Sequence, residues 1–322
     1  MILFTSVPPT TKYTHCLPKK ESAVQEFFRR LFRKPTTPHP DIATTAPLSE
    51  LQIQSIVSNT SARFDIQQLI AACGQSVGKQ RDLNEDCLLA ITSTLAGNTG
   101  NTPFGLYIVA DGMGGHQFGE VASNAAIRTV SGIIMRKFHP YLFNLKPEPP
   151  DESLQEIMQA AVSEAQKVIQ REAPGSGTTL TAALILGQQV TIAHVGDSRA
   201  YMVYSDGRIE PITRDHSLVK RLEELGHISP EEAANYPHRN VLYRALGQGE
   251  LLEPDIFTIP FPTSGLLMLC SDGLWGAVSD QELLNAVREA PNLQRACQNL
   301  VAAANTAGGP DNISVVLVQL TG

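Results

Sequence analysis

Three aspartates lie next to glycines at the ends of apolar runs, and they are the residues best suited by type and spacing to chemistry. Asp111 follows the apolar run 106–110 in D-G-M-G-G-H, Asp272 lies in S-D-G-L-W, and Asp311 lies in G-G-P-D-N. Carboxylate and carbonyl oxygens are the ligands of hard cations, and glycine lets the backbone come close to a ligand. One aspartate beside glycine is also common in turns, but three such aspartates at strand ends together indicate a divalent-cation site.

A second polar cluster, R-D-L-N-E-D at 81–86, precedes an apolar strand predicted over 87–91. A solvated turn would explain such a cluster. The alternative is a site that holds phosphate and metal together. Arg81 offers a planar fork that matches phosphate oxygens, and the carboxylates of Glu85 and Asp86 could bind a cation.

Asp197 stands in H-V-G-D-S-R, between two predicted strands. It could be a turn residue, because Asp is favoured where the chain turns. It could instead hold a further, loosely bound cation, because Mg²⁺ keeps much of its hydration. The glycine-rich stretch 175–179, G-S-G-T-T, lacks the lysine of a P-loop, so nucleotide binding is not predicted.

Strands and helices of ordinary length are expected to carry these groups. Helical spacing of apolar residues is clearest over 151–172, where Asp151 or Ser153 can cap the helix. Further helices are expected over 119–138, 217–226, 229–234, 280–290 and 292–304. Strands are expected over 180–186, 190–194, 266–270 and 313–320. The polar region 212–250 differs in texture, and we interpret it as an insertion that forms a flap facing the substrate.

Composition and cysteine spacing argue against several classes of protein. The chain has 322 residues, 42% of them hydrophobic, and a net charge of -7, which does not suggest a nucleic-acid partner. Five scattered cysteines show no C-x-x-C spacing, which indicates a reducing, cytoplasmic location and no zinc site. None of them has an arginine six positions on, which argues against a cysteine-dependent phosphatase.

Residues 1–63 read as a separate, mostly disordered extension rich in proline and threonine. It is basic, because residues 1–40 contain seven Lys or Arg and two Glu. Within it, residues 21–34 have the spacing of a short basic amphipathic helix. That helix could lie on an anionic membrane, but we favour packing on its own domain or no fixed partner. The folded domain is expected over 64–322.

Taken together, the motifs resemble those of the metal-dependent (type 2C, or PPM) serine/threonine protein phosphatases, particularly the bacterial members. R-D-L-N-E-D, V-A-D-G-M-G-G-H, G-T-T, H-V-G-D-S-R-A-Y, C-S-D-G-L and G-G-P-D-N occur in the family's order over roughly residues 75–320. The resemblance implies an α+β fold of two packed antiparallel β-sheets flanked by helices. It also implies a site for two Mn²⁺ or Mg²⁺ ions where the sheets meet, with a third implicated in bacterial relatives.

The resemblance assigns roles position by position. Asp111 would bridge both metals, the Gly112 carbonyl would bind one, and Asp272 and Asp311 would hold the other. Glu85 and Asp86 match positions that bind through waters or orient the nucleophile. Arg81 matches the phosphate-binding arginine, and Asp197 matches a residue implicated in a third metal.

The reaction implied is hydrolysis of phosphoserine or phosphothreonine by direct attack of a hydroxide shared by the metals. Phosphorylated proteins would be the substrates, opposite a Ser/Thr kinase, and we expect a monomer. Met113 stands where eukaryotic relatives have a histidine proposed as general acid, and the nearest histidine is His116.

Two alternatives stay open. One is a pseudo-phosphatase that uses the same fold for binding. The other is a phosphohydrolase that forms an aspartyl-phosphate, although the second Asp of its D-x-D-G-T motif is missing after Asp111.

Overall fold

The computed structural model describes residues 66–97, 100–114, 118–143, 148–234, 236–237, 240–249, 252–262 and 264–321. The predicted extension over 1–63, with its amphipathic helix, lies outside the described residues. His116 lies outside them as well.

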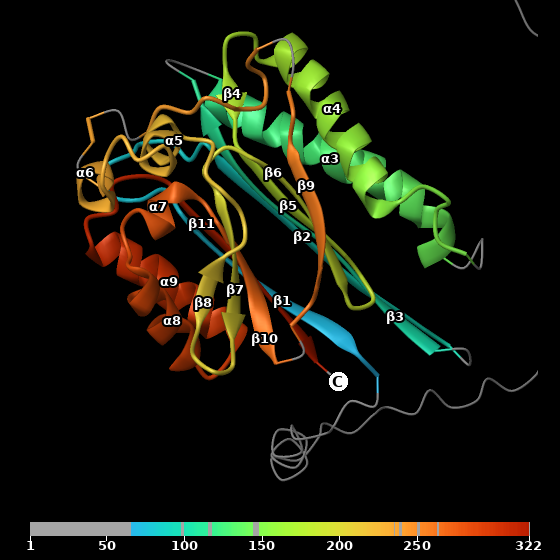
Figure 1. Ribbon diagram of the computed structural model, residues 1–322. Helices are drawn as coiled ribbons and strands as arrows, with labels where there is room; N and C mark the ends of the chain where they lie inside the picture. The colour runs from blue at the N-terminus through green and yellow to red at the C-terminus, as the bar shows by residue number, and fades with distance from the viewer. Residues whose placement is uncertain are drawn as a thin grey trace, which may run out of the picture. The chain divides into compact units, whose positions relative to one another are not determined.

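Two antiparallel sheets form the centre of the described part of the chain (Figure 1). The first runs in the order β1 (Gln68–Ser76), β11 (Ile313–Thr321), β10 (Gly265–Cys270), β7 (Arg199–Tyr204) and β8 (Ile209–Pro211). The second runs β2 (Asp86–Gly97), β3 (Gly100–Met113), β5 (Leu180–Leu186), β6 (Gln189–Val195) and β9 (Asp255–Pro260), and the short β4 (Gly177–Thr178) pairs with β3. This arrangement confirms the fold class that the resemblance implied.

Helices cover the outer face of each sheet (Figure 1). α3 (Gly119–Leu142) and α4 (Leu154–Glu172) pack on the second sheet, and α8 (Asp280–Arg288) and α9 (Leu293–Thr306) pack on the first. Ser153 begins α4 with a capping box, as the sequence allowed. The short helices α5 (Leu218–Glu224), α6 (Pro230–Ala234) and α7 (Asp272–Trp275) follow β8 and β10.

Alternation along β3 explains where its functional residue points. Leu106 and Ile108 pack in the core under α3 and α4, whereas Tyr107 and Val109 pack in the core between the sheets. Successive side chains of a strand point to opposite faces. Asp111, two residues beyond Val109, therefore faces the space between the sheets at the point where their apolar core ends.

The structure differs from the sequence-based expectations at several elements. β1 and β9 were not predicted, and β3 is longer than the predicted run 106–110, so that Asp111 lies inside a paired strand. Asp272 begins α7 and does not lie in a plain turn. Among the described residues, no helix has the length and apolar character needed to cross a membrane.

Candidate metal and phosphate site

Asp86 and Asp111 are direct partners across the β2–β3 ladder. The side chain of Asp86 is buried, and its Oδ2 accepts a hydrogen bond from Ser271 Oγ at 2.7 Å. The Ser271 hydroxyl in turn accepts from the Ser314 backbone N–H at 2.9 Å. Because Ser271 and Ser314 belong to the other sheet, this chain of bonds fixes Asp86 between the two sheets.

The backbone of Asp111 is held by the G-T-T motif. Its N–H donates to Thr179 Oγ1 at 2.9 Å, and its carbonyl accepts from Thr178 Oγ1 at 2.9 Å and from the Thr179 N–H at 2.8 Å. The motif supports the position of Asp111, a role that its glycine-rich composition did not suggest.

Gly112 is required by the close approach of two segments. A Cβ at this position would lie 2.1 Å from the Gly119 carbonyl oxygen, which is far closer than atoms can approach. The Gly112 N–H donates to the Glu85 carbonyl at 3.2 Å. The glycine therefore brings the end of β3, the start of α3 and the loop before β2 together.

Asp311 reaches the site from the loop before β11. Its Oδ2 accepts from Arg81 Nη2 at 2.7 Å, with Arg81 48% exposed and Asp311 28% exposed. Asn312, next in sequence, accepts from the Glu85 N–H at 2.7 Å and donates to the carbonyls of Val77 and Leu83. Asn312 thus holds the loop that carries Arg81 and Glu85 against the start of β11.

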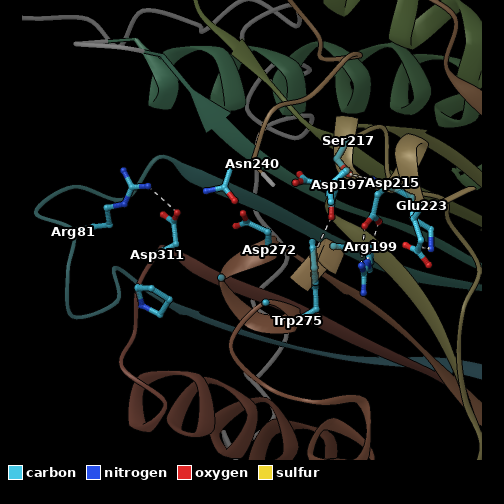
Figure 2. Close-up of a pocket in the computed structure, with 16 residues that line it drawn as sticks. Arg81, Asp197, Arg199, Asp215, Ser217, Glu223, Asn240, Asp272, Trp275 and Asp311 are labelled. Atoms are coloured by element: carbon cyan, nitrogen blue, oxygen red, sulfur yellow. Dashed lines mark hydrogen bonds and ion pairs between the residues drawn. The ribbon is translucent and has the colours of Figure 1, made fainter. Parts of the chain in front are cut away.

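Asp197 lies between β6 and β7, and its carbonyl accepts from Trp275 Nε1 at 2.9 Å (Figure 2). Gly196 before it has φ +105°, and a Cβ there would meet the side chain of Thr179 at 2.6 Å. The Gly196 N–H donates to His216 Nδ1 at 3.1 Å. The turn at Asp197 is thereby bonded to α7 on one side and to His216 on the other.

A cavity of about 330 Å³ brings most of the predicted residues together. Its lining includes Arg81, Glu85, Asp111, Gly112, Met113, Asp197, Asp272 and Asp311. Asp86 does not line it and is bonded to Ser271 behind Asp111. Figure 2 shows Asp197, Asp272 and Asp311 in a row, with the Arg81–Asp311 ion pair at one end.

Burial and mutual repulsion act on these carboxylates. Burial, followed by neighbouring carboxylates, raises the pKa of Asp111 and Asp197 well above the usual range. The same causes raise the pKa of Asp272, and burial raises the pKa of Asp86 to about 7. Asp86 Oδ1 and Asp272 Oδ1 are buried without a hydrogen-bond partner.

Bound cations would offset the repulsion between the carboxylates and would provide partners for their unpaired oxygens. The residues present therefore fit a site for hard divalent ions. Within the described residues, no three His, Cys, Asp or Glu side chains converge tightly enough to hold one ion. The carboxylates instead spread along the wall of one cavity. That spacing suits more than one ion with water completing the coordination.

Several residues of the site were quoted in motifs without a role. Ser271 and Asn312 are part of the C-S-D-G-L and G-G-P-D-N motifs. Their hydrogen bonds, however, run to residues 86 and 85, which are distant in sequence. Arg199, Asp215 and Trp275 form a further group beside Asp197, in which the Arg199 guanidinium lies 3.5 Å from the Trp275 ring centroid. The roles of these residues become visible only from contacts between segments that are far apart in the sequence, which no local sequence pattern shows.

Comparisons with known proteins all find protein phosphatases. The family model described as protein phosphatase 2C matches residues 72–233. A serine/threonine phosphatase stp of Listeria innocua is 41% identical over 216 residues, which is 66% of this chain and 84% of that protein. The serine/threonine protein phosphatase PstP of Mycobacterium tuberculosis is 36% identical over 221 residues, 67% of this chain and 40% of that protein.

Solved structures agree. The crystal structure of Mycobacterium tuberculosis PstP/Ppp aligns with a TM-score of 0.64 and 34% identity, and covers 79% of this chain and 100% of that one. A structure of the PstP catalytic domain in complex with two manganese ions aligns with a TM-score of 0.62 and 32% identity, over 80% of this chain and 100% of that one.

Proposed function

We propose a role for each residue of this site from the premise that the chain belongs to the protein phosphatase 2C family and resembles its bacterial members. It is a metal-dependent serine/threonine protein phosphatase, and Mn²⁺ or Mg²⁺ is its cofactor. One observation carries the assignment of the site. Asp272, whose buried Oδ1 has no hydrogen-bond partner, shares a cavity with the carboxylates of Asp111 and Asp311 and with an arginine whose fork is within reach of solvent.

Among the described residues that line the cavity, the proposed metal ligands are all oxygen donors, which favours Mg²⁺ or Mn²⁺ over zinc. Asp111 and the Gly112 carbonyl on β3, with Asp272 and Asp311 on the opposite side of the cavity, would hold two ions. Glu85 would contribute through waters, and Asp197 would hold a third. When bound, divalent cations neutralise phosphate oxygens and lower the pKa of a coordinated water.

Arg81 would orient the phosphate of the substrate. Its guanidinium already pairs with Asp311 at 2.7 Å, and its partial exposure leaves donors for phosphate oxygens at the mouth of the cavity. The ion pair holds the arginine beside the metal ligands, so the phosphate would be neutralised from two sides. Those contacts stabilise charge on the phosphate in the transition state.

Asp86 would act from behind Asp111. Its Oδ2 is fixed by Ser271, and its Oδ1 is buried, unpartnered and outside the cavity lining. This oxygen would accept a hydrogen bond from a water between Asp86 and the cavity and so help to orient the attacking water. Met113 lines the cavity and has no proton to give. Asp197, on the same cavity wall, would position the water that protonates the leaving alkoxide.

We also propose the substrates, the location and the oligomeric state of the protein. Phosphorylated proteins are its substrates, and a Ser/Thr kinase would act in opposition. We propose a cytoplasmic location, which the unpaired Cys73, Cys87, Cys270 and Cys297 among the described residues support. We also propose a monomer. Contact of residues 21–34 with a membrane is not favoured.

Chelation tests the proposed chemistry. Full-length protein treated with excess chelator should lose hydrolysis of a phosphoserine peptide and regain it with Mn²⁺ or Mg²⁺. Alkylation of its thiols, as the control, should leave most of the rate. Undiminished hydrolysis in excess chelator, or loss on alkylation alone, would contradict the assignment.

A further inference from the structure

A larger cavity, of about 470 Å³, adjoins the metal site. Five residues line both cavities: Arg81, Asp197, Asn240, Asp272 and Asp311. Beyond them, the larger cavity is walled by Asp215 and Ser217, by Val219 and Lys220 on α5, and by Trp275 on α7 (Figure 2). The cavity therefore extends the phosphate site toward the predicted flap.

Arg199 in this wall is fully engaged by its neighbours. Its Nε and Nη2 donate to the two carboxylate oxygens of Asp215 at 2.9 and 2.7 Å, and its Nη1 donates to Tyr201 Oη at 2.9 Å. Its flat face lies 3.5 Å from the centroid of the Trp275 ring. An arginine held in this way braces the wall, and it is a poor candidate for a second phosphate ligand.

The other charges of the wall are also paired. Lys220 Nζ lies 3.1 Å from Glu223 Oε2, and Arg81 pairs with Asp311. Among the described lining residues, only the carboxylates of Asp197 and Asp272 lack an ion-pair partner, and both are assigned to cations. The wall around α5 and α7 therefore offers a substrate no free charge.

Apolar surface is what the wall does offer. Trp275 donates its indole N–H to the Asp197 carbonyl and offers the part of its ring that Arg199 leaves uncovered, while Val219 and Ala233 add aliphatic surface. A charged side chain entering here would lose water without gaining a partner, which is costly. An apolar side chain would gain from burial.

We propose that this cavity is a subsite for an apolar, uncharged side chain of the substrate within two residues of the phosphorylated one. Adjacent Cα atoms are about 3.8 Å apart, so a near neighbour reaches a cavity whose wall is shared with the phosphate site. The inference rests on the proposed phosphatase function and adds a sequence preference to it.

A matched set of phosphoserine peptides tests the subsite in the full-length, Mn²⁺-loaded protein. Each peptide carries Leu, Ala, Lys or Glu at one of the two positions on either side of phosphoserine. At one position, kcat/KM with Leu should exceed that with Ala by roughly tenfold, as an apolar pocket allows. Lys and Glu should fall below Ala. Equal rates for all four side chains at every position would overturn the proposal.

Two variants on α5 locate the preference. Val219→Glu places a charge in the wall and should bring the Leu-to-Ala ratio near one while raising the Lys peptide above Ala. Leu218→Glu, next in the helix, 36% exposed and outside the lining, should keep the wild-type ratio. Equal shifts in both variants would overturn the subsite. Failure of the wild type on every peptide would instead overturn the phosphatase function on which it rests.

Discussion

The site has two halves that are built differently. Asp86 and Asp111 are paired across the β2–β3 ladder, and both sheets and the G-T-T motif hold them by hydrogen bonds. Arg81 and Asp311 lie on loops, 48% and 28% exposed, and hold each other by one ion pair. In the first half, Asp86 is buried and Asp111 is only partly exposed, and both are rigidly supported, whereas the second half faces solvent.

The difference has a physical reason. Asp111, the proposed cation ligand, brings a carboxylate into the space between the sheets, where burial raises its pKa, and the paired strands would hold it there against that cost. A residue that meets a bulky phosphoprotein must be reachable from outside. We expect Asp111, in the strand-held half, to govern metal binding together with Asp311, and Arg81, in the loop-held half, to govern contact with the phosphate.

The largest effect is expected at Asp111. Asp111→Asn should lower kcat on a phosphopeptide more than about a hundredfold, beyond the loss usual for groups outside the coordination shell. Because it also removes a buried charge, the chelator-treated variant should melt above chelator-treated wild type. Rate assays and thermal unfolding measure the two effects.

Exposed Asp151→Asn serves as the control, with no expected change in rate or melting. An Asp111→Asn variant that kept its turnover, or melted lower without metal, would contradict the role of Asp111 as a buried ligand.

Asp197→Ala should cost less, because Asp197 is not needed for the two central ions. Turnover of a phosphopeptide should fall by about ten- to a hundredfold, while an activated aryl phosphate, whose leaving group needs no proton, should suffer less. Steady-state rates on both substrates decide this. Equal losses would remove the proton-delivery role, and no loss on either would leave Asp197 as a turn residue.

Arg81→Ala tests the solvent-facing half of the site. It should lower kcat/KM for a phosphopeptide about tenfold or more, mostly through KM, since a charge-assisted contact to phosphate is lost. Arg81→Lys, which keeps the charge but loses the fork, should recover part of it. An unchanged kcat/KM in Arg81→Ala would show that the phosphate does not meet this residue.

The smallest effect concerns pH and the metal-free protein. The pKa of Asp86 is raised by burial to about 7, so the folded state binds more protons than the unfolded state from about pH 4 to 7. Stability of chelator-treated protein should therefore fall as pH rises from 5 to 7, by at most about 1.4 kcal/mol per unit from this group. Saturating Mn²⁺ should abolish the decline. Denaturant unfolding at each pH tests it, and a rise without metal would contradict the account.

The sequence pointed to the proposed ligands more clearly than to the residues that support them. Asp111, Asp272 and Asp311 were recognisable because each adjoins an apolar run and glycine, and the structure places them on one cavity. Ser271, Asn312 and the threonines at 178 and 179 act through bonds between segments far apart in the chain, which no local pattern encodes. The strand β9 escaped prediction because its sequence, D-I-F-T-I-P, has no regular alternation of apolar and polar residues.

Counting tightly bound Mn²⁺ is the most direct test of the central claim, that the carboxylates of this cavity hold the ions that hydrolysis requires. Chelator-treated protein would be titrated with Mn²⁺ by calorimetry, and phosphopeptide hydrolysis would be measured at the same Mn²⁺ concentrations. The account predicts two tight ions per chain, activity that appears as the second binds, and loss of both in Asp111→Asn. Full activity before any Mn²⁺ binds, or unchanged binding in Asp111→Asn, would contradict it.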